Sequence, residues 1–103
     1  MNNHQHHKIL LVEDEKNLGV TLSEKLKDDG YDLEWVRSLS EARSLLQNTQ
    51  QAVNPFRLII LDVGLPDGSG FDLAEELQSQ NRPSASKVSI LFLTAWGLSL
   101  IHI

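Results

Sequence analysis

Acidic residues stand at the ends of two apolar stretches of this chain. Glu13 and Asp14 directly follow the apolar run 8–12, and Asp62 directly follows the run 57–61. A carboxylate can attack phosphorus to form an acyl phosphate, and carboxylate oxygens are also ligands that suit Mg²⁺. If these acids share one pocket, each pair about 4 Å apart repels by roughly 4 kcal/mol at an effective dielectric of 20. Such a cluster must take up protons or bind a cation.

Two more residues are candidates for the same chemistry. Thr94 follows the apolar run 87–93, and its hydroxyl could donate a hydrogen bond to a phosphoryl oxygen. Gly64 closely follows Asp62, and without a side chain it leaves its backbone free to approach a cation. A cation would neutralise charge on a transferring phosphoryl group. Together these residues indicate phosphoryl transfer to Asp62 assisted by Mg²⁺.

Each of these residues also has an ordinary structural explanation. The acidic pair Glu13 and Asp14 would interact favourably with the N-terminus of a following helix. Aspartates such as Asp62 are common in turns, and threonines such as Thr94 are common at strand ends. Asp67 lies in a Pro-Asp-Gly turn, and the turn accounts for it fully. The functional interpretation therefore depends on several of these residues converging at one edge of a sheet.

Four apolar runs mark the strands that would bring the residues together. The runs at 8–12, 33–36, 57–61 and 87–93 are short and nearly continuous, which is typical of strands buried on both faces. Amphipathic segments separate them. This alternation predicts an α/β fold with a parallel sheet covered on both faces through right-handed crossovers. In such a sheet, functional residues gather beyond the carboxyl ends of the strands.

The segments between the strands have helical spacing. Leu18, Leu22 and Leu26 recur every four residues, so we expect them in the core, and Gly30 stands where a helix C-terminal glycine belongs. Ser38 and Glu41 have the spacing of a capping box and would begin a second helix. The inner side of that helix would carry Leu39, Ala42, Leu45 and Leu46. The third helix would be lined by Phe71, Ala74 and Leu77. The expected loops are 48–55, 64–70 and 81–86.

The composition of the chain argues against several classes of function. A length of 103 residues with 41% hydrophobic residues fits a single globular domain. The net charge of −5 and the lack of a basic patch argue against direct nucleic-acid binding, and the absence of cysteine excludes thiolate metal sites and a cysteine nucleophile. The apolar runs are too short to cross a membrane. The polar start of the chain, including His4, His6 and His7, is expected to be a solvated tail without a signal peptide, so we expect a cytoplasmic location.

With the elements and candidate residues in order, the sequence resembles the receiver domains of response regulators in two-component phosphorelays. The run from Ile9 to Glu15 is similar to their first strand and acidic pair. The run from Leu61 to Gly70 resembles their phosphoacceptor loop, and Leu93-Thr94-Ala95 resembles their switch threonine with its small neighbour. The resemblance covers residues 8–95, and both order and spacing agree. It implies a flavodoxin-like, doubly wound sheet in which the first four strands have the order 2-1-3-4.

The resemblance also assigns roles to the candidate residues. It implies that a sensor histidine kinase phosphorylates Asp62. It implies that Asp14 binds Mg²⁺ directly, that Glu13 does so mainly through water, and that the Gly64 carbonyl is the third protein ligand. Thr94 would move toward the phosphoryl group as the switch. The loop 64–70 looks most like that of regulators whose downstream output domain is a DNA-binding winged helix.

After residue 95 the sequence departs from the family pattern. Receiver domains continue through a fourth helix, a fifth strand and a fifth helix, and a lysine that ends the fifth strand contacts the phosphoryl group. Here only Trp96 to Ile103 remain, and no lysine follows Lys87, which precedes the fourth strand at the wrong end of the sheet. We interpret 1–7 as a polar tail, 8–95 as an incomplete receiver domain, and 96–103 as a tail of foreign origin. If the tail joins the sheet, it must run antiparallel to the fourth strand.

Three functions compete on this evidence. The leading one is a Mg²⁺-dependent phosphoacceptor that assists its own phosphorylation but is not a turnover enzyme. The alternative is a phosphate-independent interaction module or an inactive fragment, which the missing lysine favours. A phosphohydrolase with an aspartate nucleophile is the third; enzymes of the haloacid dehalogenase type need a second acid where this chain has Gly64. Tryptophan fluorescence could follow a Mg²⁺ titration, but Trp35 and Trp96 are expected to lie too far from the acids to report it.

Overall fold

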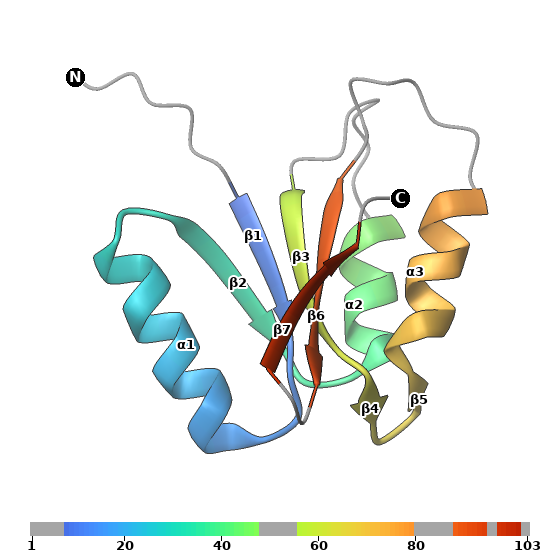
Figure 1. The fold of residues 1–103 in the computed structure, drawn as a ribbon, viewed down its shortest axis with the longest axis horizontal. Coiled ribbons are helices and arrows are strands. Elements are labelled where there is room, and N and C mark those ends of the chain that lie inside the picture. The colour runs from blue at the N-terminus through green and yellow to red at the C-terminus, as the bar shows by residue number, and fades with distance from the viewer. Residues whose placement is uncertain (1–7, 48–55, 80–87, 95–96, 102–103) are drawn as a thin grey trace.

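The computed structural model describes residues 8–47, 56–79, 88–94 and 97–101. It contains a five-stranded sheet in the order β2-β1-β3-β6-β7 and a separate small pair, β4-β5. Strands β1, β2, β3 and β6 pair in parallel, as Figure 1 shows by their arrows. The predicted α/β class and the order of the first four predicted strands are therefore confirmed.

The parallel strands lie close to the predicted apolar runs. Residues of the runs alternate between the two faces of the sheet, and most are buried on both. Strand β1 coincides with its predicted run, and the other three differ from theirs by one or two residues at an end. The bounds are Lys8–Val12 for β1, Asp32–Val36 for β2, Phe56–Asp62 for β3 and Ser89–Thr94 for β6. Lys87 lies outside the described residues.

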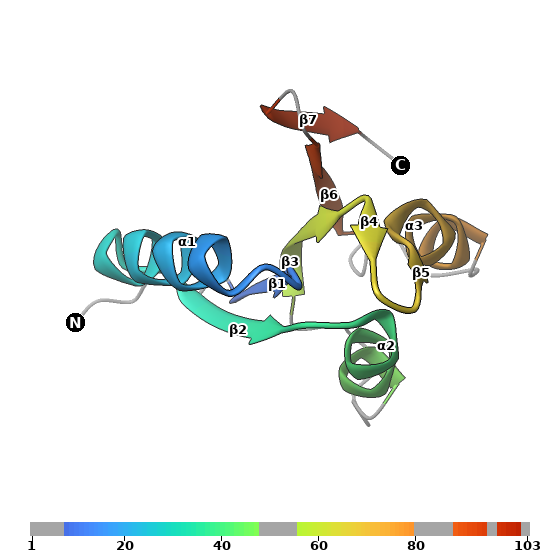
Figure 2. The ribbon, with the colours of Figure 1, turned by 90° about the horizontal axis from the view of Figure 1, so that it is seen from below.

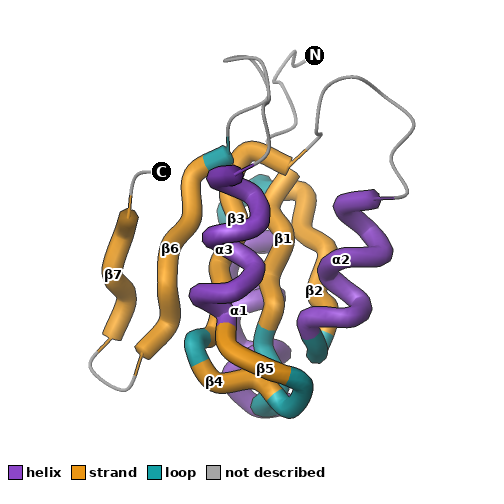
Figure 3. Tube along the Cα trace, turned by 90° about the vertical axis from the view of Figure 1, so that its right-hand side faces the viewer, coloured by secondary structure: helices purple, strands orange, loops and turns teal. Residues whose placement is uncertain are grey.

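Helices cover both faces of the sheet. Figure 2 shows α1 (Lys16–Asp28) on one side of the strands, and α2 (Leu39–Gln47) and α3 (Gly70–Ser79) on the other. In Figure 3, α2 and α3 stand in front of the sheet and α1 stands behind it. The larger core cluster lies under α2 and α3 and includes Leu10, Ile59 and Phe92. The smaller cluster lies on the α1 side and includes Leu11 and Ile60.

Helix α1 begins and ends with the local signals that its sequence carries. The Glu15 carboxylate accepts a hydrogen bond from the Leu18 N–H and caps the first turn. At the other end, Gly30 has φ +98°, and the N–H groups of Gly30 and Tyr31 donate to the carbonyls of Lys27 and Leu26. These two bonds form a Schellman motif, so the predicted C-terminal glycine is confirmed.

Two apolar residues that the sequence placed in the core are exposed. Leu22 and Leu26 are half-buried against the smaller cluster, but Leu18 in the first turn of α1 remains 38% exposed. Phe71 at the start of α3 is 50% exposed, and its ring lies tilted against that of Phe92, with ring centroids 4.7 Å apart. Both predictions were wrong because helical spacing shows which residues share a face, but not how far the sheet extends beneath them.

Helix α2 begins with a capping hydrogen bond, and the loop before α3 contains strand pairing that was not predicted. Ser38 Oγ accepts a hydrogen bond from the Glu41 N–H, as a capping box requires, while the Glu41 carboxylate accepts from the Arg37 N–H. The predicted loop 64–70 contains a short antiparallel pair, β4 (Gly64–Leu65) and β5 (Gly68–Ser69). The predicted loops 48–55 and 81–86 lie outside the described residues.

The end of the chain joins the sheet as its fifth strand. Strand β7 (Gly97–Ile101) pairs antiparallel with β6, from Thr94 opposite Gly97 to Ile90 opposite Ile101. The antiparallel direction expected for a tail that joins the sheet is therefore confirmed. As a result, β6 is an interior strand, and the outer edge of the sheet on this side is β7 (Figure 3).

Candidate functional site

The carboxyl ends of β1 and β3 lie side by side at the lower edge of the sheet in Figure 1. Val12 is paired with Leu61, so the next residue of each strand, Glu13 and Asp62, continues the same register. Two carboxyls from distant parts of the sequence therefore meet where the strands end. This adjacency is the arrangement that the proposed chemistry requires.

Glu13 is buried against Asp62. Only 2% of Glu13 is exposed, and burial raises the pKa of its carboxyl above the usual value because a charge is poorly solvated there. The charge of Asp62 and a hydrogen bond with its carboxyl raise this pKa further, whereas a bond from the Glu15 N–H, 2.6 Å long, opposes the rise. A bond between two carboxyls needs a shared proton, so the pair accommodates either that proton or a cation.

Asp62 is half-buried, and its surroundings limit its movement. The Gly64 N–H donates to Asp62 Oδ1 over 3.3 Å. Behind it, Gly70 approaches so closely that a Cβ at this position would overlap the Asp62 carbonyl, and the Gly70 N–H donates to Val63 O over 2.8 Å. The start of α3 therefore supports the backbone on which the Asp62 carboxylate is mounted. The sequence marked Gly70 only as a turn residue.

Asp14 follows Glu13, but its side chain is exposed. Within the described residues, no three Asp, Glu or His side chains form a group that could hold a metal ion. The structure thus brings together Glu13 and Asp62 and does not bring Asp14 into a three-carboxylate cluster with them. The role of Asp14 as a direct ligand stays a prediction.

Thr94 and Gly64 occupy the expected positions in the backbone. Leu93 is paired with Asp62, so Thr94, the last residue of β6, lies just beyond Asp62 at the same edge of the sheet. Gly64 is exposed, and no atom lies within 4 Å of where its Cβ would be, so the space beside its backbone is open. Their functional roles stay predictions.

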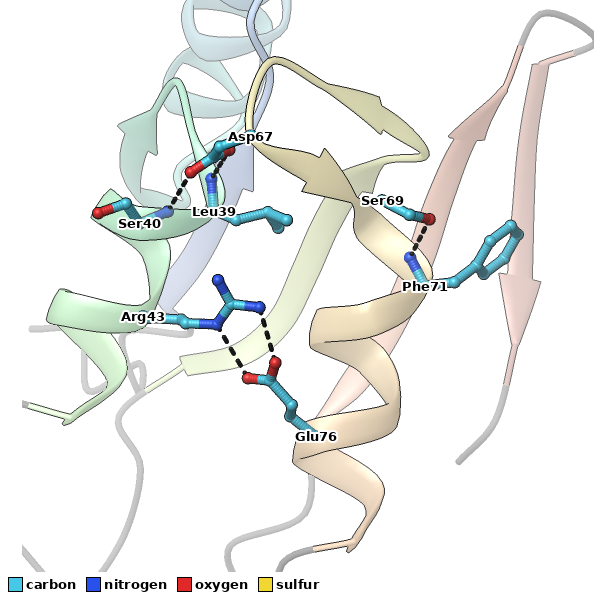
Figure 4. Close-up of polar contacts among 7 residues, drawn as sticks. All are labelled: Leu39, Ser40, Arg43, Asp67, Ser69, Phe71 and Glu76. Carbon is cyan, nitrogen blue, oxygen red and sulfur yellow. Dashed lines mark hydrogen bonds and ion pairs between the residues drawn. The ribbon is translucent and has the colours of Figure 1, made fainter.

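Asp67 does more than form a turn. Figure 4 shows its carboxylate at the N-terminus of α2, where Oδ1 accepts from the Leu39 N–H and Oδ2 from the Ser40 N–H, each over 2.9 Å. These bonds lower the pKa of the Asp67 carboxyl. The interpretation that the turn explains this residue fully was therefore wrong. A carboxylate at a helix N-terminus pairs with free backbone donors, and here it fixes the loop after Asp62 to α2.

A second link joins α2 to α3. In Figure 4, Arg43 of α2 meets Glu76 of α3 in a two-pronged ion pair, with N–O distances of 3.0 and 2.7 Å. This pair lowers the pKa of Glu76 and raises that of Arg43. Sequence reasoning missed the link because the partners lie on different helices with no local spacing rule between them.

Trp35 in β2 and Arg37 just after it lie next to the acidic pair Glu13 and Asp14. The indole N–H of Trp35 donates to the Glu13 carbonyl and Arg37 Nη2 donates to the Asp14 carbonyl, each over 2.9 Å. The expectation that Trp35 lies at a distance from the acids was wrong. Val12 and Val36 are register partners in β1 and β2, so the residues beyond each strand end meet. Trp96 lies outside the described residues.

Comparisons with known proteins identify the family. The family described as the response regulator receiver domain matches residues 9–100. The chain is 36% identical over 90 residues to response regulator RppA of Synechocystis sp., covering 87% of this chain and 36% of RppA. This chain therefore belongs to the response regulator receiver family of two-component signalling. It spans about a third of the length of the first curated relatives it matches.

Solved structures of receiver proteins have the same fold. The response regulator TrrA of Thermotoga maritima, solved in complex with Mg²⁺-BeF, matches with a TM-score of 0.71 at 29% identity, covering 86% of this chain and 70% of that one. A structure of the histidine kinase ThkA in complex with TrrA matches with a TM-score of 0.71 at 28% identity, covering 88% and 71%. In the part of this chain that the structure describes, no helix is long and apolar enough to cross a membrane.

Proposed function

We propose that this chain accepts a phosphoryl group on the Asp62 carboxylate from a sensor histidine kinase. In this proposal Mg²⁺ is bound by Asp14 directly, by Glu13 mainly through water, and by the Gly64 carbonyl. The observation that carries it is the burial of Glu13 against the half-buried Asp62, which favours positive charge beside the acceptor. The complexes of TrrA with Mg²⁺-BeF and with ThkA support the same cation and the same class of partner.

The proposed step is a displacement at phosphorus. A carboxylate oxygen of Asp62 attacks the phosphorus of a phosphohistidine, and an O–P bond forms as the N–P bond breaks. The departing imidazole keeps the electron pair and takes up a proton. Mg²⁺ supplies neutralising charge to the phosphoryl oxygens when bound. The bond from the Gly64 N–H restricts rotation of the Asp62 carboxylate before the attack, and Thr94 would donate to a phosphoryl oxygen afterwards.

The product is a modified protein, so the proposal describes a cytoplasmic signalling module and not a turnover enzyme. Phosphorylation would change the contacts around Asp62 and Thr94 at the carboxyl edge of the sheet. In the parent protein, a downstream domain such as a winged-helix DNA-binding domain would respond to that change. This chain spans about a third of the length of these relatives, and the receiver family matches its residues 9–100.

Intact mass measurement tests the acceptor. The chain is incubated with Mg²⁺ and acetyl phosphate, and one phosphoryl adduct is expected on the wild type and on Asp72→Asn, which removes an exposed acid in the first turn of α3. No adduct is expected on Asp62→Asn. An adduct that persists in Asp62→Asn assigns the acceptor elsewhere and overturns the proposal.

The same measurement decides between the leading function and its alternative. The alternative is a phosphate-independent interaction module. The phosphoryl-contacting lysine that the receiver resemblance implies is not among residues 1–103, so only a longer chain can test its contribution. A version of native length, extended through the rest of the receiver domain, is therefore assayed beside the 103-residue chain. Absence of the adduct on both favours the interaction module and rejects the phosphoacceptor.

A further inference from the structure

Trp35 in β2 and Arg37 just after it bind the backbone carbonyl groups of Glu13 and Asp14. Trp35 Nε1 donates to the oxygen of Glu13, and Arg37 Nη2 donates to the oxygen of Asp14, with both distances 2.9 Å. The donors lie 22 and 23 residues further along the chain than their acceptors. The backbone that carries both acids is thus fixed from outside its own loop.

The two donors are themselves held in place. A Cβ at Gly19 would overlap the Trp35 ring, so the indole lies directly against the backbone of α1. The Arg37 guanidinium lies over the same ring, 5.9 Å from its centroid. The backbone N–H of Arg37 donates to Glu41 Oε1 over 2.7 Å, which ties this residue to the start of α2. The indole is therefore packed between α1, the acidic loop and Arg37.

Fixing the two carbonyls has a consequence for the carboxylates. The orientation of each peptide group sets the direction in which the side chain leaves the neighbouring Cα, so these bonds restrict where the acids of Glu13 and Asp14 can point. The Glu13 carboxylate is restricted further by the bond from the Glu15 N–H. Groups that orient metal ligands without touching the cation raise the affinity for it, because ligands that are already ordered lose less conformational entropy when the cation binds.

We propose that Trp35 and Arg37 are positioning residues for the acidic pair: they set the affinity of the site for a divalent cation, and Trp35 reports its binding by fluorescence. The inference rests on the cation site of the proposed function. It assigns neither residue a contact with the cation or the phosphoryl group. Trp35 is an effective reporter because its indole N–H is bonded to the backbone of Glu13, next to the charge that the cation neutralises.

The experiment measures Mg²⁺ binding without phosphate. Trp96→Phe leaves Trp35 as the one tryptophan of the chain, which has two. Adding Mg²⁺ to this variant should change the Trp35 emission and saturate. Isothermal titration calorimetry on the chain with both tryptophans gives the dissociation constant independently. An absence of any emission change, when calorimetry detects binding, overturns the reporter role.

Substitutions test the positioning role. Arg37→Gln removes the guanidinium donor from an exposed side chain, so the fold should persist, and Trp35→Phe removes the indole N–H while keeping an aromatic ring against Gly19. Each should weaken Mg²⁺ binding about tenfold, the lower end of the effect of removing groups that orient metal ligands. Arg37→Lys keeps a donor and should recover part of the affinity. Glu76→Gln breaks the ion pair between α2 and α3 and should leave the dissociation constant unchanged.

The outcomes separate this inference from the proposed function. If Arg37→Gln and Arg37→Lys are folded by circular dichroism and bind Mg²⁺ as tightly as the wild type, the positioning role is overturned, whatever the fate of Trp35→Phe. The proposed function then still stands if Asp62 takes up the phosphoryl adduct. If the wild type binds no Mg²⁺ and gains no adduct, both fail together.

Discussion

At the scale of single residues, the carboxyls of Glu13 and Asp62 oppose folding whenever both are ionised, because Glu13 is buried and the two lie together. Two such charges 4 Å apart repel by about 1 to 4 kcal/mol, depending on the effective dielectric. Asp62→Asn removes one of them and leaves an amide that can donate to Glu13. Without divalent cations, we expect this variant to be more stable than the wild type by about 1 kcal/mol, since a shared proton already relieves part of the repulsion.

Thermal unfolding with EDTA and with excess Mg²⁺ checks this expectation. In EDTA the variant should unfold at a temperature about 4 to 8 °C higher, the usual shift per 1 kcal/mol for a domain of this size. With Mg²⁺ the difference should shrink or reverse, because the wild type gains stability by binding the cation. Asp72→Asn is the control for the loss of an exposed charge. Equal unfolding temperatures of wild type and Asp62→Asn in EDTA contradict the repulsion.

In contrast to Glu13 and Asp62, the charged Asp67 carboxylate stabilises the folded state. Hydrogen bonds from the Leu39 and Ser40 N–H groups lower the pKa of the Asp67 carboxyl from its usual 3.8. A group whose pKa is lower in the folded state stabilises fully above its unfolded pKa and loses that contribution as the pH falls through the folded pKa. We therefore expect Asp67→Ala to be less stable than the wild type at pH 7, and the difference to narrow as the pH falls below about 3.8.

Urea unfolding at a series of pH values measures that difference. Asp67→Asn is the informative comparison, because its amide oxygen keeps one acceptor for the α2 N-terminus and lacks the charge. Its stability relative to Asp67→Ala should not depend on pH in this range. A wild-type advantage over Asp67→Ala that is the same at pH 7 and pH 3 rejects a charged cap.

At the scale of elements, Ser23 is the clearest defect of α1. Ser23 is 8% exposed, and its Oγ has no hydrogen-bond partner among the described residues. A buried hydroxyl without a partner costs about 1 to 3 kcal/mol, and alanine has the higher helix propensity. Ser23→Ala is therefore expected to stabilise the chain by about 1 kcal/mol, measured by urea unfolding. Ser40→Ala, an exposed serine of α2, is the matched control, and destabilisation by Ser23→Ala contradicts the buried defect.

The elements also show how far the sequence could predict the fold. Strands β1 and β3 were predictable because a continuous apolar run buried on both faces has few other interpretations, and their shared edge then brought Glu13 and Asp62 together. The hydrogen bonds that Trp35 donates and that Asp67 accepts were not predictable. Each joins residues more than twenty positions apart, and the contact depends on strand register and helix placement that no local spacing encodes. The exposure of Phe71 has the same origin.

At the scale of the whole molecule, β7 extends the sheet on one side and covers the edge of β6. Five residue pairs join β7 to β6, whose sequence Ser-Ile-Leu-Phe-Leu-Thr is strongly apolar. Without β7, the backbone of β6 would present unpaired N–H and C=O groups along an apolar edge, which is a template for association with other chains. We expect a chain that ends after Ala95 to unfold at a lower temperature than the full chain and to associate at lower protein concentration.

Two deletions of similar length separate this effect from the mere loss of residues. One removes 96–103, and the other removes 1–7, the polar segment that precedes β1. Light scattering against concentration and thermal unfolding should show the larger change for the first, because that deletion removes the pairing of β7 with β6. If both shortened chains behave like the full chain, β7 contributes nothing to the sheet's stability, and β6 must be protected by other means. If the first alone associates, the pairing of β7 with β6 is what limits association of the chain.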